Sequence, residues 1–360
     1  MSVPAARARA VAERVAERGL DLLLVTDLVN VRWLTGFTGS NAAAVVGRDG
    51  QLRFVTDFRY LSQSADELDD AWERTIAPDL LAAFAGGLGE GELRAGFDDA
   101  SMSVKDHRRL SALLAGGVVL ERAGGLVEKL RAIKDAAELE AIRASARLAD
   151  DALTEVIGRG LVGRTEREVA LDLEFTMRRM GAQQISFPPI VAAGAHGALP
   201  HADPTDDPIP AGTLVVIDWG AQKDGYASDC TRTYATGELD PRDAEVYALV
   251  LEAQEAALAG VRPGPTGREV DAIARSIIDA AGHAEHFGHG LGHGVGLDVH
   301  EGPRLSKQGE TPLATGMVVT VEPGVYVPGA IGVRIEDLAV VTPDGAEVLS
   351  SLPKELQIVP

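Results

Sequence analysis

The feature that most constrains this 360-residue chain is a repeat within its C-terminal part. Residues 165–169 reappear as residues 266–270, and each segment has the pattern of a capping box that opens an amphipathic helix. Farther along, residues 212–218 match residues 316–322, where an apolar strand ends in a carboxylate. The matches keep their order, at offsets of 101 residues (165 to 266) and 104 residues (212 to 316). Since only two copies exist, the repeat predicts two related α/β halves that face each other, and not a solenoid.

Each half supplies two carboxylates near the end of an apolar strand. The first half has Asp218 and Asp229, and the second has Glu322 and Glu336. In each pair the first carboxylate lies where a strand meets a tight turn and the second lies on the returning strand, so a hairpin can bring them together on one face. Four carboxylates in apolar surroundings need compensating positive charge, and two divalent cations supply it. Oxygen-rich ligation with one imidazole favours Mn²⁺, while cobalt, iron and zinc stay open.

Histidine is scarce, and its placement is uneven. Six of the eight histidines fall within residues 201–300, and the glycine-flanked segment 288–294 carries two of them. Glycines let the backbone and a cofactor approach closely. His293 is the predicted nitrogen ligand, because the carboxylate cluster otherwise lacks one. We interpret four others as loop, structural or surface residues: His283, His286, His107 and His196.

The first part of the chain has the pattern of a compact α/β unit. Short apolar runs bounded by turn residues predict strands at 22–25, 43–46, 52–55 and 94–97. A long helix should follow, capped by Asp135 with Glu138 completing a capping box. The fold class is therefore α/β (α+β), with two domains at residues 1–125 and 126–360.

Composition excludes several classes of protein. The formal net charge of -20 makes nucleic-acid binding unfavourable, because an acidic surface repels phosphate backbones. No apolar run approaches the roughly 20 residues that span a bilayer, so no membrane partner is expected. The single cysteine, Cys230, fits a reducing compartment, and residues 1–18 lack a secretory signal. These features lead us to expect a cytoplasmic protein.

The motifs around the carboxylates and histidines are similar to those of a known family. From about residue 133 to its end, the chain resembles the pita-bread metallopeptidases, which include prolidase, aminopeptidase P and methionine aminopeptidase. The resemblance implies a pita-bread domain of two α/β halves, two divalent metal ions, and attack on the scissile carbonyl by a hydroxide that bridges them. It rests on five segments: 200–201, 218–232, 288–301, 321–326 and 334–337.

The resemblance also implies roles for individual residues. Glu322 matches the family's proposed general base, and His201 and His300 match outer histidines that hold the substrate and stabilise the developing oxyanion. His289 matches a histidine that lines the substrate pocket, and Arg334 matches an arginine that orients ligands. The implied metal ligands are Asp218, Asp229, His293, Glu322 and Glu336.

The N-terminal region resembles the creatinase-like domain of Xaa-Pro peptidases, and residues 29–40 are similar to the short bacterial aminopeptidase P group. Methionine aminopeptidases lack this domain, so we expect an exopeptidase for proline-containing peptides. Proline has no N–H and a restricted φ, so Xaa-Pro bonds evade general peptidases. We favour aminopeptidase P, which removes the first residue of longer peptides. The alternative is prolidase, a dipeptidase in which Arg304 could bind the C-terminal carboxylate of the substrate.

Two further alternatives share the scaffold. A non-catalytic relative would serve as a binding module, and a creatinase would hydrolyse its substrate without metal. The complete set of five predicted ligands argues against both. The resemblance also implies a homodimer.

Overall fold

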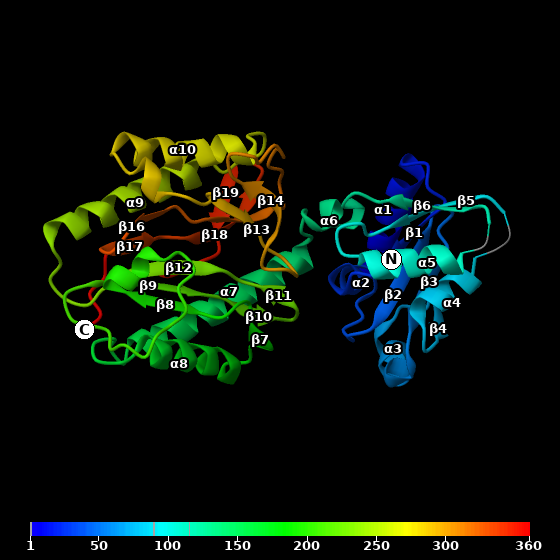
Figure 1. Ribbon diagram of the computed structural model, residues 1–360, viewed down its shortest axis with the longest axis horizontal. Helices are drawn as coiled ribbons and strands as arrows, with labels where there is room; N and C mark the ends of the chain where they lie inside the picture. Colours follow the sequence, from blue (N-terminus) through cyan, green and yellow to red (C-terminus); the bar gives the residue numbers. More distant parts are fainter. Residues whose placement is uncertain (1, 89–90, 115) are drawn as a thin grey trace. The chain divides into compact units, whose positions relative to one another are not determined.

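The structure is a computed structural model that describes residues 2–88, 91–114 and 116–360 (Figure 1). The chain folds as two compact units, Met1–Arg131 and Ala132–Pro360. The boundary predicted between residues 125 and 126 lies just before helix α6 (Leu126–Arg131), which contacts helices of the N-terminal unit. Among the described residues, no helix is long and apolar enough to cross a membrane.

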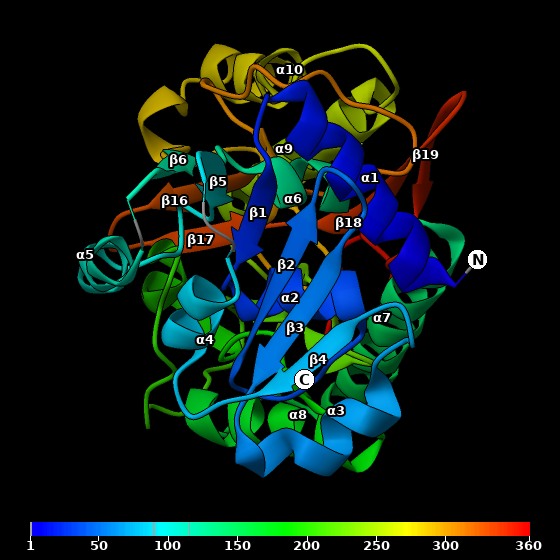
Figure 2. The ribbon, with the colours of Figure 1, turned by 90° about the vertical axis from the view of Figure 1, so that its right-hand side faces the viewer.

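The N-terminal unit is built on one mixed sheet with the strand order β4-β3-β2-β1-β5-β6 (Figure 2). Strand β1 runs antiparallel to β2 and parallel to β5. Helices α1, α2 and α6 contact one another, and α4 contacts α5. The elements are α1 (Val3–Glu17), β1 (Leu22–Val25), α2 (Leu28–Thr35), β2 (Ala42–Gly47), β3 (Leu52–Thr56), the short 3-10 helix η1 (Phe58–Tyr60), α3 (Leu61–Glu67), β4 (Glu73–Ile76), α4 (Leu80–Gly86), β5 (Leu93–Phe97), α5 (Val104–Leu113), β6 (Val118–Arg122) and α6.

The four strands predicted for this unit are present as β1, β2, β3 and β5. The sequence pattern missed β4 and β6, which are the two edge strands of the sheet. Neither contains a fully buried residue, whereas all four residues of β1 are buried. Edge strands of this kind lack the apolar run that marks a central strand, so periodicity alone does not reveal them.

Asp98 is a buried carboxyl group that follows β5, with 5% of its surface exposed. It accepts hydrogen bonds from the backbone N–H groups of Thr26 (3.1 Å) and Asp27 (3.3 Å). Burial raises the pKa of Asp98 to about 7 in spite of these bonds. Between about pH 4 and this pKa the folded state therefore keeps a proton that the unfolded chain has released, so the free energy of unfolding falls as the pH rises.

We expect Asp98→Asn to stabilise the protein at pH 8 by up to about 4 kcal/mol and to have little effect near pH 4. Asparagine keeps an oxygen acceptor for the two N–H groups and carries no charge to bury. Urea unfolding at both pH values measures the difference. The matched control is Asp66→Asn on the exposed surface of α3, which should give the same small difference at both pH values. An Asp98→Asn effect independent of pH would contradict the expectation.

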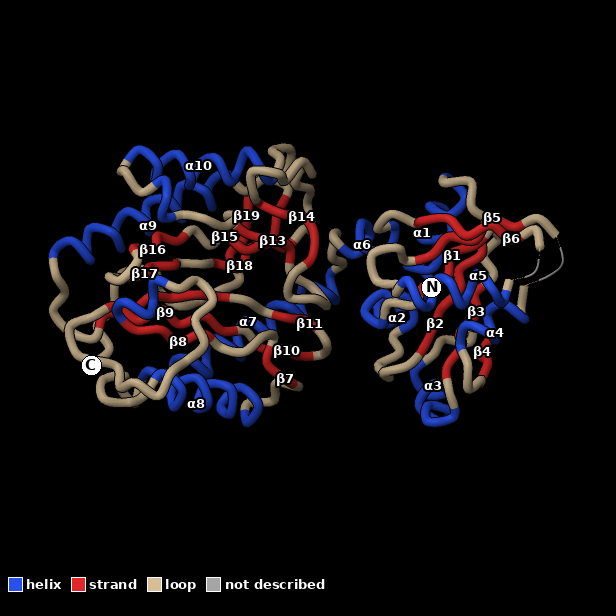
Figure 3. Tube along the Cα trace, viewed as in Figure 1, coloured by secondary structure: helices blue, strands red, loops and turns tan. Residues whose placement is uncertain are grey.

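The C-terminal unit has helices on both sides of its strands (Figure 3). Helices α7 and α8 share a core with the sheet β12-β9-β8, and α9 and α10 share a core with strands β15 to β18. Strands β14-β13-β15-β18-β19 form the second large sheet, and β16-β17 form a hairpin. The elements are α7 (Ala136–Ile157), α8 (Glu166–Arg179), β7 (Gln184–Ile185), β8 (Ile190–Ala193), η2 (Gly194–Ala198), β9 (Leu214–Trp219), β10 (Ala221–Lys223), β11 (Tyr226–Ala227), β12 (Cys230–Ala235), α9 (Pro241–Gly260), α10 (Gly267–Ala280), η3 (Ala284–His286), β13 (Gly292–Gly294), β14 (Glu301–Leu305), β15 (Val318–Val321), β16 (Gly324–Val327), β17 (Ile331–Arg334), β18 (Asp337–Thr342) and β19 (Gly345–Val348).

The sequence repeat corresponds to a structural repeat. Thr165 and Thr266 each form a complete capping box, and the helices that follow, α8 and α10, are both 14 residues long. Each threonine also pairs through an isolated antiparallel bridge with a later proline. Gly212 and Gly316, which precede β9 and β15, have φ values of 75° and 90°, a region that L side chains rarely adopt. The same turn therefore introduces the carboxylate-bearing strand in both halves.

Candidate metal centre

The carboxylates of the first half come together because β9 and β12 are paired. Asp218 lies near the end of β9, and its register partner is Thr231 of β12. Asp229 lies two residues before Thr231 and therefore projects to the same face. We predicted Asp229 within the returning strand, but it lies just before β12 begins.

The carboxylates of the second half face each other across a break in the ladder. Val321 pairs with Asp337 in the β15–β18 ladder, and Gly324 pairs with Arg334 in the β16–β17 hairpin. The second ladder continues the register of the first. Residues 322 and 336, which lie between the two ladders, are therefore opposite each other. The second predicted carboxylate, too, is therefore at a strand end and not within a strand, because one ladder stops here and the next begins.

Six polar side chains of the two halves converge at this position. Single ligand atoms of Asp218, Asp229 and Glu336 lie within 4.8 Å of one another, and so do those of Asp229, His293 and His300. Asp229 belongs to both groups. His293 Nε2 lies 3.5 Å from an Asp229 oxygen and 3.3 Å from Glu322 Oε1. The structure thus brings all the predicted ligands together and adds His300 at the edge of the cluster.

Two carboxylate oxygens of the cluster are free to bind a metal ion. Asp218 Oδ1 and Glu336 Oε1 are buried and have no hydrogen-bond partner among the described residues. Burial raises the pKa of Asp229 and of Glu336 well above the ordinary value, and the neighbouring carboxylates raise both further. A buried oxygen without a donor and a carboxylate crowded by others are both stabilised when a divalent cation binds between them.

Arg334 is the buried cation of the protein itself within this cluster. It is 3% exposed, and its Nη2 donates to Asp218 Oδ2 at 2.6 Å. Its Nε donates to Thr231 Oγ1 (2.9 Å) and its Nη1 to Tyr326 Oη (2.8 Å). Thr231 Oγ1 in turn donates to Glu336 Oε2 at 2.7 Å. The guanidinium therefore orients one carboxylate of each half, directly or through the threonine.

The pKa of Glu322 is shifted in the opposite direction from those of the neighbouring carboxylates. Burial alone would raise its pKa, but the hydrogen bond and charge of His293 outweigh burial and hold that pKa at about 2. Thr320 Oγ1 donates to Glu322 Oε1 at 2.9 Å and accepts from the backbone N–H of His293 at 3.1 Å. The lowered pKa favours the ionised carboxylate of Glu322, which lies within the cluster and can accept a proton.

Three more histidines surround the cluster. His289 Nε2 lies 3.0 Å from Tyr326 Oη, and the rings of His293 and His300 meet edge to face with centroids 4.3 Å apart. Burial lowers the pKa of His289 and of His300, and the nearby His201 contributes to both shifts. His201 itself is exposed, in the loop that follows η2. These imidazoles are therefore close to one another, and two of them favour the neutral form.

Arg304 lies on β14, directly opposite His293 of β13. Residues opposite each other in an antiparallel ladder project to the same face. The Arg304 side chain is exposed and makes no ion pair with any residue that the structure describes. Its charge contributes to the lowered pKa of His300. The sheet therefore carries an available guanidinium beside the predicted metal ligands.

The remaining histidines lie elsewhere. His196 bonds to buried Glu166 at 2.8 Å, and the ring nitrogens of His283 and His286 lie 2.9 Å apart. His107 packs against Phe97 in the N-terminal unit. None of these four belongs to the cluster, in agreement with their interpretation from sequence.

Sequence reasoning missed three residues that support the cluster: Thr231, Thr320 and Tyr326. Two of them carried a usable signal. Thr231 lies two residues after Asp229, and Thr320 lies two residues before Glu322, so strand alternation places each on the same face as a carboxylate. Tyr326 carried no such signal, because its contact with Arg334 depends on how the β16–β17 hairpin folds.

Two protein families match this chain. Residues 140–343 match metallopeptidase family M24, and residues 7–133 match the creatinase/prolidase N-terminal domain. An uncharacterized peptidase of Bacillus subtilis (strain 168), YqhT, is 41% identical over 342 residues, which cover 95% of this chain and 96% of that protein.

Solved structures show the same similarity over the full length. An Xaa-Pro dipeptidase from Bacillus anthracis has a TM-score of 0.93 at 37% identity and covers 99% of both chains. An X-Pro aminopeptidase from Thermotoga maritima MSB8 has a TM-score of 0.87 at 34% identity, covering 96% of this chain and 99% of that chain.

Proposed function

Because the chain belongs to metallopeptidase family M24, we propose that it is a metal-dependent Xaa-Pro dipeptidase, a prolidase. The observation that carries this proposal is Arg304, whose guanidinium lies on the same face as His293 and has no ion-pair partner among the described residues. A dipeptide ends in a carboxylate close to its scissile bond, and arginine binds carboxylates in a bidentate manner. The likeness to the Xaa-Pro dipeptidase of Bacillus anthracis supports the same activity. Our preference from sequence was aminopeptidase P, and the position of Arg304 reverses it.

Five side chains of the cluster would hold two divalent cations, for which we propose Mn²⁺. When bound, such cations activate water as a nucleophile and polarise the scissile carbonyl. Asp229 belongs to both groups of converging ligand atoms, so its carboxylate would contribute to holding both ions. The five proposed ligands are Asp218, Asp229, His293, Glu322 and Glu336.

Glu322 is the proposed proton acceptor and donor. Its pKa of about 2 keeps it ionised near neutral pH, so it can accept a proton from the attacking water. It then passes this proton to the proline nitrogen, which leaves as an amine. Proton transfer by a positioned group contributes roughly 10²- to 10⁴-fold to such reactions.

The outer histidines and Arg304 act on the substrate. His300 favours the neutral imidazole, which can donate one hydrogen bond to the substrate without adding charge to the site. In neutral His289 the single N–H is already used, because Nδ1 donates to the carbonyl of Gly290 at 2.7 Å, so its Nε2 can only accept a hydrogen bond. His201 is exposed and close to both, and we assign it to the developing oxyanion of the carbonyl. Arg304 binds the C-terminal carboxylate and sets the length of the peptide.

Aminopeptidase P is the second candidate function. The X-Pro aminopeptidase of Thermotoga maritima aligns with 96% of this chain, and residues 29–40 resemble the short bacterial aminopeptidase P group. In that activity the peptide continues beyond proline, and no substrate carboxylate reaches Arg304.

Hydrolysis of Ala-Pro and Ala-Pro-Ala separates the two functions. We expect the Mn²⁺-loaded protein to cleave Ala-Pro, to leave the tripeptide nearly intact, and to lose activity on chelation. Arg304→Ala should raise KM for Ala-Pro by roughly 10- to 100-fold, since a charge-assisted hydrogen bond is worth about 1.5–3 kcal/mol.

The matched control is Arg268→Ala, which removes another exposed arginine of the same unit, one that is paired with Glu310. This variant should retain the wild-type KM. Cleavage of the tripeptide with equal or greater efficiency would establish aminopeptidase P instead. A protein that binds metal and cleaves neither peptide would refute the Xaa-Pro assignment.

A further inference from the structure

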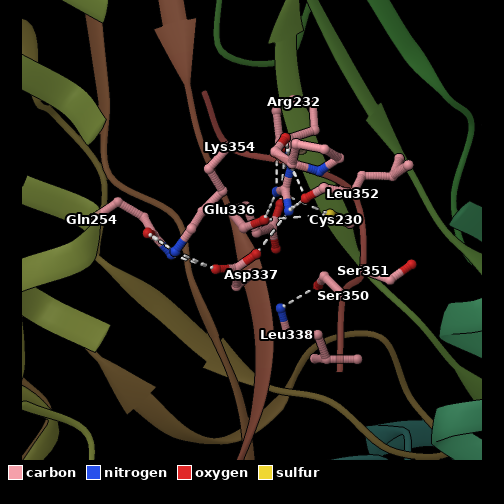
Figure 4. Close-up of polar contacts among 12 residues, drawn as sticks. Cys230, Arg232, Gln254, Glu336, Asp337, Leu338, Ser350, Ser351, Leu352 and Lys354 are labelled. Atoms are coloured by element: carbon pink, nitrogen blue, oxygen red, sulfur yellow. Dashed lines mark hydrogen bonds and ion pairs between the residues drawn. The ribbon is translucent and has the colours of Figure 1, made fainter. Parts of the chain in front are cut away.

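A buried ion-pair network lies on the face of β12 that points away from the carboxylate cluster (Figure 4). Side chains alternate along this strand, so Thr231 contacts Glu336 and Arg334 on the cluster side, while Cys230 and Arg232 point to the opposite side. No residue on this second face takes part in the proposed mechanism. Cys230 nevertheless contacts the backbone carbonyl of Glu336, one of the proposed ligands.

Arg232 is the centre of this network. It is 1% exposed, and its Nη2 donates to Asp337 Oδ1 at 2.8 Å and to the carbonyl of Leu352 at 2.7 Å. Its Nε donates to the carbonyl of Pro353 at 3.1 Å, and its Nη1 donates to the carbonyl of Glu336. One guanidinium therefore links the C-terminal segment to the backbone of a proposed metal ligand.

Asp337 joins Arg232 to a second cation, Lys354, which is partly buried. Its Oδ2 accepts from Lys354 Nζ (2.9 Å) and from Gln254 Nε2 (3.0 Å). Lys354 Nζ also donates to Gln254 Oε1 at 2.8 Å. Figure 4 shows the Asp337 carboxylate between the two cations. Asp337 is 1% exposed, and a buried ion pair that loses one partner leaves an uncompensated charge.

No strand ladder holds the backbone of Glu336, and the network supplies one of its hydrogen bonds. It lies between β17 and β18, outside both. Its backbone N–H donates to the carbonyl of Thr231 at 3.1 Å, and its carbonyl accepts from Arg232 and from the Cys230 thiol (3.3 Å). The backbone of the proposed ligand is thus fixed by β12 and by the Arg232 side chain, which Asp337 helps to position.

We propose that Asp337 and Lys354 are positioning residues for Glu336, and that the C-terminal segment carrying Lys354 thereby sets the metal affinity of the cluster. The proposal rests on the proposed function of Glu336 as a metal ligand. Residues that orient metal ligands typically change metal affinity by 10- to 100-fold when they are replaced. Here the effect passes through the backbone of the ligand, by way of Arg232.

Titration of the metal-free, full-length protein with Mn²⁺ tests the proposal. Lys354→Met keeps most of the length of the side chain and removes its charge, and we expect it to weaken Mn²⁺ binding by about 10-fold. Asp337→Asn should have a larger effect of up to about 100-fold. Lys354→Arg restores the cation and should recover most of the affinity. At saturating Mn²⁺, KM for Ala-Pro should stay at the wild-type value in the two lysine variants.

The control removes an ion pair of the same unit that does not reach Glu336. Glu347→Gln in β19 breaks the contact with Arg143 (2.7 Å) and should bind Mn²⁺ as the wild type does. If Lys354→Met lowers the Tm of the metal-free protein but leaves Mn²⁺ affinity unchanged, the network is only structural and the proposal is wrong. If the wild-type protein binds Mn²⁺ but cleaves no Xaa-Pro peptide, the proposed substrate is wrong. The Mn²⁺ affinities of the variants relative to the wild type still test this inference in that case.

Discussion

Replacing His293 by alanine should remove one bound cation and nearly all peptidase activity. His293 Nε2 is 3.5 Å from an Asp229 oxygen and 3.3 Å from Glu322 Oε1, which places it where the two carboxylates converge. Loss of a cation removes several kcal/mol of transition-state stabilisation, so kcat/KM for Ala-Pro should fall by about 10³-fold or more. Metal analysis of the purified variant should show fewer ions per chain than the wild type.

A matched substitution separates ligand loss from a general effect of removing an imidazole. His283 belongs to the same half but pairs with His286 outside the cluster, so His283→Ala should keep both metal and activity. Asp229→Ala should be at least as damaging as His293→Ala, because Asp229 belongs to both groups of converging ligand atoms. A His293→Ala protein with the wild-type metal content and turnover would remove this histidine from the ligand set.

The position of the cluster could be predicted because the repeat marks it twice. In both halves a glycine precedes an apolar strand that ends in a carboxylate, and in both halves that glycine has a positive φ. A strand end after a tight turn is a local feature, so sequence pattern is sufficient to find Asp218 and Glu322. Pattern also identified the capping boxes of α8 and α10, which depend on residues only three positions apart.

The bonds that hold the cluster could not be predicted, because they join segments that are distant in sequence. Arg334 contacts Asp218, which precedes it by more than one hundred residues, and Arg232 contacts the C-terminal segment over a similar separation. Such contacts follow from how the sheets pack and not from the spacing of residues along the chain. The edge strands β4 and β6 could not be predicted for a different reason, because neither has a buried apolar face.

The choice between the two Xaa-Pro activities illustrates the same limit. From sequence, Arg304 is the residue that could bind the substrate carboxylate in the prolidase alternative. Its meaning depends on the register of β13 and β14, in which a bulge after His293 changes the pairing. That register places Arg304 opposite His293, and no sequence pattern specifies it, because a shift by one residue would turn the side chain to the other face.

The second large effect is expected for His201→Ala, which should retain both cations and lose catalytic rate. His201 is exposed, contributes to the lowered pKa values of His289 and His300, and belongs to neither group of converging ligand atoms. The carbonyl of the preceding Pro200 accepts a hydrogen bond from Arg334 at 3.2 Å, so the loop is fixed to the cluster. Removing one donor to a developing oxyanion typically lowers kcat by about 10²- to 10³-fold.

The test of His201→Ala combines metal content with kcat for Ala-Pro. Asp203→Asn changes an exposed side chain two residues farther along the same loop and serves as the control, with kcat expected to stay at the wild-type value. A fall in kcat with unchanged metal content would assign His201 to the substrate. Loss of metal together with activity would instead make it part of the ligand set, and unchanged kinetics would exclude it from the mechanism. Because the loop is anchored by a backbone carbonyl, the alanine substitution should leave Arg334 in place, so a change in rate reports on the imidazole itself.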